Sequence, residues 1–379
     1  MSEIKPIVSI VIPTYERYKY LYECVEATRS IVSDELELVI QDNTADNKEF
    51  AAYIERIADS RVKYYHKKDH VSVVENCDMG IAHATGEYVC MLGDDDTACS
   101  SIIKAAHYMK DNHIDACSFP FPGFYWPDMN WRKGEKIENM FFHKKGDGIV
   151  EPIDTKQEVK RNACRGALGR NMVRVYHGMV SKACLDRIYN KVGTFFPGPS
   201  PDMANAVAVC LEAKNAVYIG DYLIVSGYGN ASSRGQSRRN EHFGRIEDMP
   251  WLPKDTKDNW DDNTPPIFSA LTIFAVSAIN ALNRMEVNRK EYPFDYTDLY
   301  SSFFWQHKTV RSEFLVFVLR SPKRLYWFVK GVSKKIIRRL LRRVKEKNHY
   351  KNLTNVESLF DAKRITEELS SKMELHVSD

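Results

Sequence analysis

The sequence lacks the patterns that mark several common classes of protein. Its eight cysteines form no C-x-x-C pair, which excludes zinc ribbons and thioredoxin-type redox motifs. No stretch of about 18 uncharged apolar residues occurs, so no helix is predicted to span a membrane. P-loop and G-x-G-x-x-G motifs are missing as well, which disfavours kinases and dehydrogenases. Because repeats and low-complexity tracts are also absent, we expect an ordinary globular chain.

The composition indicates a folded chain from a reducing compartment. With 379 residues, of which 44% are hydrophobic and 28% charged, the chain has room for one large α/β domain and an appendage. The cysteines are scattered among mostly apolar neighbours, as in proteins of the cytosol. The N-terminal apolar run is short and is interrupted by Pro13, unlike a signal peptide. These features predict a cytoplasmic location.

The net charge of +3 conceals a strong asymmetry. Residues 310–347 contain thirteen Lys or Arg and two Glu, a net charge of +11, which leaves −8 for the rest of the chain. An acidic body therefore carries a basic C-terminal segment. Such an asymmetry suggests that the basic segment has an anionic partner.

The first 120 residues alternate between two periodicities. Short runs rich in β-branched residues are separated by stretches with helical spacing. This alternation predicts parallel βαβ units, whose ligands bind beyond the carboxyl ends of the strands. The predicted strands are 7–12, 36–40, 62–65, 88–92 and 116–119, and the predicted helices are 18–31, 50–58, 71–83 and 100–112.

This alternation ends after residue 119. Prolines and aromatic residues at 120–131 predict an ordered loop, and the Gly/Ser/Arg-rich stretch 227–244 predicts a mobile one. Asp202 follows a turn-rich segment and is a predicted helix N-cap. The other predicted elements are strands at 173–180, 216–219 and 222–226 and helices at 181–192, 203–214 and 267–282.

Three predicted strands end in polar residues that would meet in one crevice. The first strand is followed by Thr14 and Arg17, the second by Asp42, and the fourth by an aspartate triplet at 94–96. Three successive carboxylates repel one another, and solvent or a divalent cation relieves that repulsion. A solvated acidic turn that begins a helix is the alternative interpretation of the triplet.

These motifs together resemble those of the family 2 glycosyltransferases, which have the GT-A fold. The resemblance extends over residues 6–119 and is looser to residue 226. It implies a Rossmann-like, mostly parallel sheet with flanking helices, a nucleotide-sugar donor, Mn²⁺ or Mg²⁺, and inversion at the anomeric carbon. The matching stretches are Val8-Ser-Ile-Val-Ile-Pro-Thr-Tyr15, Gln41-Asp42-Asn43, Asn76 with Gly80, and Gly86-Glu-Tyr-Val-Cys-Met-Leu-Gly-Asp-Asp-Asp96.

The resemblance also implies a role for each matching residue. The triplet matches the DxD-type motif, with Asp96 as the metal ligand. Gln41 stands where the family usually has an aspartate, and Glu75 stands where it often has an arginine, so contacts to the base and the phosphates depart from the usual pattern. The residues assigned to the nucleotide-sugar pocket are Pro13, Thr14, Tyr15, Arg17, Asp42, Asn76, Asp94 and Asp95.

Asp202 is the residue that the resemblance assigns to catalysis. The family has a carboxylate at a helix N-terminus after a turn-rich stretch, where it takes the proton of the attacking hydroxyl. Asp202 in Gly198-Pro-Ser-Pro-Asp202 fits that position. We expect the helix dipole to lower the pKa of its carboxyl group and to keep it ionised. A purely structural N-cap is the alternative role.

Two histidines and several aromatic residues complete the predicted site. His242 is a candidate metal ligand, with a solvated loop histidine as the alternative. His177 and Trp126 are candidates for the acceptor site, with an ordinary structural role as the alternative for both. The loop arginines that would contact the donor on closure are Arg234, Arg238 and Arg239, and the other aromatic residues that would stack on a sugar or cover a lipid are Phe119, Phe121, Phe124, Tyr125 and Trp131.

Residues 310–347 have a helical period with separate apolar and cationic faces. This predicts amphipathic helices on an anionic membrane surface. Packing on the chain's own domain, or in a homo-oligomer, is one alternative, and nucleic-acid binding is another that leaves Trp327 and Phe328 unexplained. The apolar positions include Val332, Ile336, Ile337, Leu340, Leu341 and Val344, and the basic ones include Lys334, Lys335, Arg338, Arg339, Arg342 and Arg343.

The sequence thus predicts a metal-dependent glycosyltransferase on the inner face of the cell membrane. It would move a sugar, in the first instance from a UDP-sugar, to a saccharide or lipid-linked glycan of a cell-surface polysaccharide. A nucleotidyltransferase acting on sugar phosphates is the rival enzyme, and a non-catalytic glycan- or membrane-binding module is the rival outside enzymes. The predicted organisation is a GT-A domain at 1–226 (nucleotide-sugar-binding half 1–120, acceptor half 121–226), a mobile loop and helical extension at 227–309, basic amphipathic helices at 310–347, and a polar tail at 348–379.

Overall fold

The computed structural model describes residues 5–130, 139–169, 171–232, 235–236, 242–341 and 350–377. Its first part alternates strands and helices, and every strand and helix that we predict up to residue 112 is confirmed to within two residues. The elements are β1 (Val8–Thr14), α1 (Tyr18–Arg29), β2 (Leu36–Asp42), α2 (Lys48–Ile57), β3 (Val62–His66), α3 (Val73–His83), β4 (Tyr88–Met91), β5 (Thr97–Ala98) and α4 (Ser101–Asp111).

The strand β1 shows why this sheet is buried on both faces. Ile10 and Ile12 belong to the core shared with α1 and α4, whereas Val11 belongs to the core shared with α3. Because successive side chains of a strand point to opposite faces, a strand with a core on each side reads as a continuous apolar run. The parallel neighbours of β1 are β2 and β4, so the carboxyl ends of all three lie at one edge.

The second part of the chain is less regular and departs more from the predictions. The predicted strand at 173–180 is reduced to β10, because His177 takes a left-handed conformation with φ of 53° that ends the extended run. The predicted loop at 120–131 contains a strand, β7. The elements are β6 (Ala116–Ser118), β7 (Pro122–Tyr125), β8 (Met140–Phe142), β9 (Ile149–Pro152), α5 (Thr155–Ala163), β10 (Met179–Ser181), α6 (Lys182–Val192), α7 (Pro201–Glu212), β11 (Ala216–Ile219) and β12 (Ile224–Tyr228).

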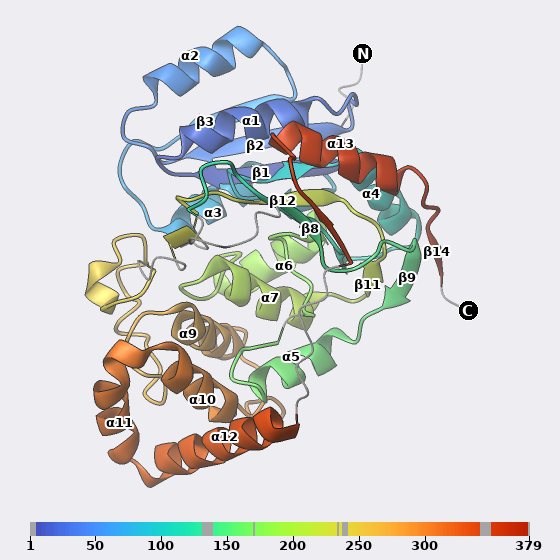
Figure 1. The fold of residues 1–379 in the computed structure, drawn as a ribbon. Helices are drawn as coiled ribbons and strands as arrows, with labels where there is room; N and C mark the ends of the chain where they lie inside the picture. Colours follow the sequence, from blue (N-terminus) through green and yellow to red (C-terminus); the bar gives the residue numbers. More distant parts are fainter. Residues whose placement is uncertain are drawn as a thin grey trace.

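A helical extension follows and packs on the same core as α3, α6 and α7. Phe314 and Trp327 of the extension belong to that core, and Figure 1 shows these helices (orange) stacked beyond α7. The predicted helix at 267–282 is confirmed as α9. The elements are a 3-10 turn (Ile246–Asp248), α9 (Ala270–Arg284), α10 (Thr297–Gln306), a second 3-10 turn (Lys308–Val310), α11 (Arg311–Leu319) and α12 (Pro322–Leu341).

The end of the chain returns to the N-terminal part. Residues 350–377 form β13 (Lys351–Leu353), α13 (Leu359–Ser370) and β14 (His376–Val377). Leu359 and Ala362 of α13 are buried in the core with α1, and Figure 1 shows α13 (red) beside α1 and α4. The segment that we predicted as a polar tail is therefore part of the fold.

Two sheets frame the residues that the structure describes. A nine-stranded sheet has the order β14-β9-β11-β6-β10-β4-β1-β2-β3, and a five-stranded sheet has the order β13-β8-β7-β12-β5. The α/β class is confirmed. The large sheet is mixed: five of its eight described strand pairings are parallel, while β10 inserts antiparallel between β4 and β6 and β9 runs antiparallel to β11. Across the described part of the chain, no helix is both long enough and apolar enough to cross a bilayer.

Candidate active site

The carboxyl ends of β1 and β4 meet at the first aspartate of the triplet. Thr14 Oγ1 donates a hydrogen bond to Asp94 Oδ2 at 2.8 Å. The Arg17 guanidinium makes a bidentate contact with the same carboxylate, with Nε 3.0 Å from Oδ2 and Nη2 2.8 Å from Oδ1. Asn76 Nδ2 donates to the main-chain oxygen of Thr14 at 3.2 Å, while its buried Oδ1 has no hydrogen-bond partner among the described residues. The structure thus brings together these four predicted residues.

The other two aspartates are held by main-chain amides at the end of β12. The N–H of Gly227 donates to Asp96 Oδ1 at 2.8 Å, and the N–H of Gly229 donates to Asp95 Oδ2 at 3.0 Å. A Cβ at Gly227 would lie 1.7 Å from the main-chain oxygen of Asp95, so only glycine permits this approach. Trp126 Nε1 donates to that same oxygen at 3.1 Å. The start of the predicted mobile loop therefore supports the triplet.

His177 lies against the third aspartate. Its Nε2 is 2.6 Å from Asp96 Oδ2, and its main-chain N–H donates to the oxygen of Met91 at 3.1 Å. The imidazole stacks on Tyr176, with ring centroids 4.0 Å apart, and meets Phe121 edge-on. A left-handed backbone is unfavourable for a residue with a side chain, so neighbouring contacts must hold His177 in place. This residue, predicted for the acceptor site, touches the predicted metal ligand instead.

Asp202 occupies the first turn of α7 and faces the same cluster. The N-cap of α7 is Ser200, so the assignment of Asp202 as N-cap was wrong. Burial raises the pKa of Asp202, although Arg174 and His177 act to lower it, and the charge of Asp96 raises it further. Our expectation of a lowered pKa fails because desolvation outweighs the favourable charges near the helix terminus. A carboxylate of raised pKa is a better proton acceptor.

The buried residues around the triplet and Asp202, which we call the crevice after the predicted site, carry an excess of negative charge that suits a hard cation. Burial and the charge of Asp96 raise the pKa of Asp95 to about 7. The triplet and Asp202 contribute four carboxyl groups to one network. In this network the positive charge of Arg17 acts on Asp94, and that of Arg174 acts on Asp202. Carboxylate oxygens in such excess fit Mg²⁺ or Mn²⁺. Within the described residues, no three His, Cys, Asp or Glu side chains are arranged to hold a metal ion, so substrate phosphates and water would have to supply its other ligands.

Asp42 is buried and already accepts three hydrogen bonds within the protein. Its Oδ2 accepts hydrogen bonds from the hydroxyls of Tyr18 at 2.5 Å and Tyr64 at 2.7 Å, and its Oδ1 accepts one from the N–H of Thr44 at 2.8 Å. The side chain is fully buried. In this arrangement Asp42 orders the end of β2, and the predicted contact with a base or ribose remains a prediction. Neither tyrosine is marked by its local sequence as a partner of Asp42.

The rim of the crevice is more open. Tyr15 is 45% exposed, and its ring meets that of His70 edge-on with centroids 5.5 Å apart. Pro13 is half-buried beside it in β1. Glu75 forms a capping box with Ser72 at the start of α3. The residue at the position of the family's usual arginine therefore caps the N-terminus of this helix.

The remaining predicted site residues lie elsewhere or serve the core. His242 stacks on Trp251 and meets Phe268 edge-on, and burial lowers its pKa. Trp126 is buried and holds the main chain of the triplet, and Phe119 and Phe124 are buried in the core. Further predicted residues fall outside the described part of the chain, namely Arg234, Arg238, Arg239, Trp131, Arg342, Arg343 and Val344.

The fold and crevice define an α/β domain with a buried acidic site at the carboxyl edge of its parallel strands. Residues 9–166 match the model of the family described as Glycosyl transferase family 2. Glycosyltransferase GlyG of Streptococcus pneumoniae is 30% identical over 165 residues, which are 43% of this chain and 51% of GlyG. An uncharacterized glycosyltransferase of Rickettsia felis is 28% identical over 136 residues, or 35% of this chain and 21% of that protein.

The matched region therefore spans about half of GlyG and about a fifth of the rickettsial protein. Among solved structures, S. aureus TarS 1–349 in complex with UDP-GlcNAc has 14% identity and a TM-score of 0.48, with 93% of this chain and 97% of that chain covered.

Proposed function

We propose that this protein transfers a sugar from a nucleotide-sugar donor, with a UDP-sugar favoured, to a saccharide or lipid-linked glycan of a cell-surface polysaccharide. The proposed reaction inverts the anomeric carbon and uses Mn²⁺ or Mg²⁺. The observation that carries the proposal is the junction of the triplet with the first turn of α7. His177 contacts Asp96 at 2.6 Å, and the charges of both residues act on the pKa of Asp202. A donor-side carboxylate and a base thus share one network.

Asp202 is suited to the role of general base, because burial raises its pKa above that of an exposed aspartate. In the proposed step, the proton of the acceptor hydroxyl passes to the Asp202 carboxylate. The acceptor oxygen forms its bond to the anomeric carbon as the bond from that carbon to the diphosphate breaks. The electron pair leaves with the diphosphate. A single displacement of this kind inverts the anomeric centre.

The triplet and Arg17 are suited to the diphosphate side of the reaction. A bound divalent cation supplies positive charge that neutralises the leaving diphosphate. Thr14 and Arg17 hold Asp94, and the amides of Gly227 and Gly229 hold the other two carboxylates. Groups held this firmly need little reorganisation when the charge of the leaving group develops.

The test of the donor site is a thermal-shift panel of UDP, GDP, CMP and dTDP, each with and without Mn²⁺. We expect one nucleotide to raise the melting temperature of the wild type only with metal, since a ligand that binds the native state stabilises it. Asp96→Ala should lose this shift. Asp111→Ala, which removes an exposed aspartate of α4, should keep it.

The outcomes separate the proposal from its rivals. No shift with any nucleotide would point to a binding module without donor chemistry. A metal-dependent shift that survives Asp96→Ala would remove Asp96 from the metal site. Sugar-1-phosphate and nucleoside triphosphate as joint substrates, with release of pyrophosphate, would identify a nucleotidyltransferase.

We also propose that α11 and α12 dock on the anionic inner surface of the cell membrane. One face of α12 packs on the protein, where Trp327 is only 8% exposed, so the alternative of packing on the chain's own domain holds for that face. The opposite face leaves apolar side chains in solvent, with Tyr326 60% and Ile337 54% exposed. We name as the exposed stripe Val316, Leu319, Leu325, Tyr326, Val329, Ile336 and Ile337.

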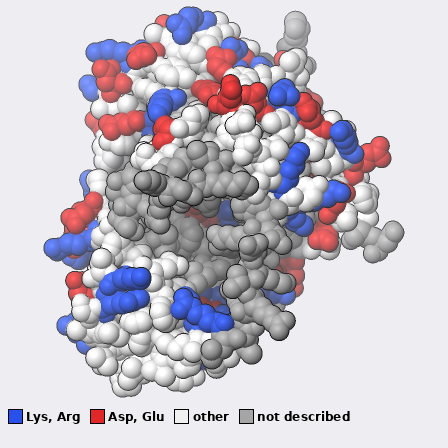
Figure 2. Space-filling view, viewed as in Figure 1, with Lys and Arg blue, Asp and Glu red and all other residues white. Residues whose placement is uncertain are grey.

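Cations flank the exposed stripe. Arg320, Lys323 and Arg338 are exposed side chains of the same two helices and their link. In Figure 2 the lower part of the surface, which corresponds to the extension in Figure 1, shows broad uncharged areas with patches of Lys and Arg. An apolar stripe bordered by cations complements a bilayer surface with anionic headgroups.

Vesicle binding tests this proposal with the full chain. The double variant Val329→Glu/Ile337→Glu should bind vesicles of phosphatidylcholine and phosphatidylglycerol at least about tenfold more weakly, because each buried apolar side chain contributes about 1.5–3 kcal/mol. Val32→Glu, at a 98% exposed valine of the N-terminal part, is the matched control and should bind as the wild type does. Equal binding by the double variant, or equal binding without phosphatidylglycerol, would contradict the proposal.

A further inference from the structure

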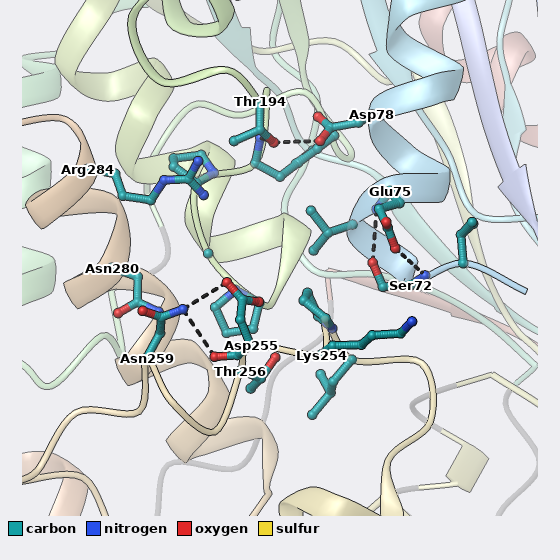
Figure 3. A pocket seen from close by; sticks show the side chains of 18 of the residues that line it. Ser72, Glu75, Asp78, Thr194, Lys254, Asp255, Thr256, Asn259, Asn280 and Arg284 are labelled. Atoms are coloured by element: carbon teal, nitrogen blue, oxygen red, sulfur yellow. Dashed lines mark hydrogen bonds between the residues drawn. The ribbon is translucent and has the colours of Figure 1, made fainter.

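A large cavity lies between the N-terminal part of the chain and the extension (Figure 3). Its volume is about 740 Å³. It is bounded by the start of α3, by the turn at 194–199, by residues 250–259, and by the end of α9. Its volume is within the range of roughly 300–1,000 Å³ that is typical of small-molecule sites.

Neighbouring residues connect the cavity with two parts of the crevice. His70 lines it, and the ring of His70 meets that of Tyr15, a predicted nucleotide-pocket residue. The turn that lines its other side leads within three residues to Asp202. In addition, the charges of Asp78, which lines the cavity, and of Asp202 both raise the pKa of Cys77. The cavity thus adjoins Tyr15 through His70 and the start of α7 through the turn, while Tyr15 and Asp202 themselves are not among its lining residues.

The lining has the chemistry of a carbohydrate site. Figure 3 shows amide, carboxylate and hydroxyl side chains around the cavity, among them Asn259, Asn280 and Thr194. Prolines such as Pro197 and Pro253 supply flat apolar patches between these groups. A sugar ring presents hydroxyls that donate and accept hydrogen bonds, and it presents C–H faces that pack on such patches.

One polar atom of the lining lacks a partner. Thr256 is 3% exposed, and its Oγ1 makes no hydrogen bond among the described residues. A buried polar group without a partner is unfavourable, and in native proteins it calls for a water, ion or ligand. Because this atom has less than 1 Å² of accessible surface, a ligand hydroxyl in the cavity would satisfy it only after the Thr256 side chain turns toward the cavity.

The charges of the lining disfavour an anionic ligand. Three acidic residues, Glu75, Asp78 and Asp255, line it together with two basic residues, Lys254 and Arg284. Asp78 acts as a hydrogen-bond acceptor, since its carboxylate accepts hydrogen bonds from Thr194 Oγ1 and from the N–H of Phe195. A phosphorylated or sulfated ligand would meet net repulsion, whereas an uncharged sugar would not.

We propose that this cavity binds an uncharged oligosaccharide, the non-reducing end or branch of which is the acceptor for the reaction at the crevice. The role of this oligosaccharide as acceptor rests on the proposed function, whereas its binding in the cavity does not. The walls that residues 250–284 build lie outside the matched region at 9–166.

The extension also sets the position of the shared turn. Ser277 Oγ of α9 accepts a hydrogen bond from the N–H of Ser200 at 2.8 Å. A Cβ at Gly198 would lie 2.9 Å from the main-chain oxygen of Ser277, so the turn fits against α9 only with glycine there. The wall of the cavity and the segment that carries Asp202 are therefore held by one helix of the extension.

Saturation-transfer NMR with a panel of uncharged di- and trisaccharides tests the inference on the full chain. We expect at least one of these sugars to receive saturation from the wild type. Asn280→Trp, which fills the cavity from a half-buried position of α9, should abolish the transfer. Thr256→Val, which keeps the shape and removes the hydroxyl, should weaken binding by about two- to tenfold.

Each variant has a matched control. Ala270→Trp adds the same ring at an exposed position of α9 outside the cavity. Thr297→Val removes another buried hydroxyl that has no partner among the described residues, in α10 and outside the cavity. Both controls should bind the sugar as the wild type does, and all four variants should keep the metal-dependent nucleotide shift.

The outcomes keep the two proposals apart. If no sugar of the panel binds the wild type, or if binding survives Asn280→Trp, the inference is overturned. If a sugar binds in the cavity and no nucleotide shift occurs, the saccharide site stands and the proposed transfer fails. If phosphorylated forms of the same sugars bind more tightly, the assignment to an uncharged ligand is overturned.

Discussion

The crevice and the helix α12 each carry a concentration of charge of one sign, but they treat it in opposite ways. In the crevice, Asp94, Asp95 and Asp96 are at most 5% exposed, and their carboxylates are held by amides, Thr14, Arg17 or His177. On α12, the side chains of Lys323, Arg338 and Arg339 are exposed to solvent.

This difference teaches where charge is costly. Removing a carboxylate from water disfavours its charged form, so the pKa of Asp95 rises to about 7 and the site favours any cation that enters. The exposed cations Lys323 and Arg338 of α12 incur no such penalty, so they are available to a partner without changing the fold, whereas Lys334 pairs with Asp298 and burial lowers the pKa of Lys335. The crevice is thus organised for chemistry, and the helix face is organised for association.

The largest expected effect concerns the crevice alone. Asp202→Asn keeps the shape of the side chain and removes the basic carboxylate, so the rate of sugar transfer should fall by about 10²- to 10⁴-fold. The nucleotide-induced thermal shift should remain, because Asp202 has no role in donor binding in our proposal. Rate measurements with donor and acceptor check this, with Asp111→Asn as control. A loss of less than about tenfold would show that another group takes the proton.

The second prediction tests whether helix α13, near the end of the described chain, packs into the core of the N-terminal part. Leu359 of α13 is fully buried, so Leu359→Ala should lower the free energy of unfolding by about 2–5 kcal/mol. Phe360→Ala removes a 41% exposed neighbour and should change that free energy by about 0.5 kcal/mol or less. Chemical denaturation of the full chain measures both. Equal, small effects would mean that α13 does not contribute to the core.

A third change acts on the support of the triplet. Gly227→Ala places a Cβ against the main-chain oxygen of Asp95 and should destabilise the protein by about 1–3 kcal/mol. It should also weaken the metal-dependent nucleotide shift, because Asp96 loses the position that the Gly227 amide provides. Gly244→Ala is the control, since its Cβ would meet only the flexible Met249 Cε, at 3.1 Å. Thermal melts with and without nucleotide and Mn²⁺ distinguish the two variants.

The smallest effect lies in the extension, where burial lowers the pKa of His242 and His307 from the ordinary value of 6.5. Both imidazoles are neutral in the native state above that value, and the unfolded chain binds protons more readily as the pH falls. The stability that they contribute is therefore fully present above pH 6.5 and is lost as the pH falls through the lowered pKa values.

The double variant His242→Phe/His307→Phe should reduce the fall in melting temperature between neutral and acidic pH. His376→Phe, at an exposed histidine of β14, should leave that fall unchanged. The same slope in the double variant and the wild type would contradict the expected pH dependence.

Local pattern predicts the first third of the fold well, and long-range pairing limits the rest. The strands and helices from β1 to α4 follow from apolar runs and helical spacing, because each is buried in a regular way. The pairing of β13 at 351–353 with β8 at 140–142 joins residues more than 200 positions apart. No local period encodes such a partner, since strand register depends on which surfaces meet after folding.

The candidate site shows the same division. The triplet and Asp202 are visible as carboxylates after a buried strand and at the start of a helix, and the structure places both in one network. Asp42 is equally visible, yet two tyrosine hydroxyls from α1 and β3 occupy it. His177 was assigned to the acceptor site, and only the folded chain brings it to Asp96. The sequence shows which groups are present, and not which of them are already satisfied.

By itself, the sequence determined the α/β class, the parallel strands of the first part, the acidic turn after β4 and the amphipathic character of α12. These depend on periodicity and on residue type, which are local properties. Only the tertiary structure decided which face of α12 stays in solvent, that Gly227 and Gly229 support the triplet, and that residues 250–284 close a cavity against the start of α3 and the turn at 194–199. Those features depend on contacts between distant segments, and the burial of charge that they produce sets the chemistry of the site.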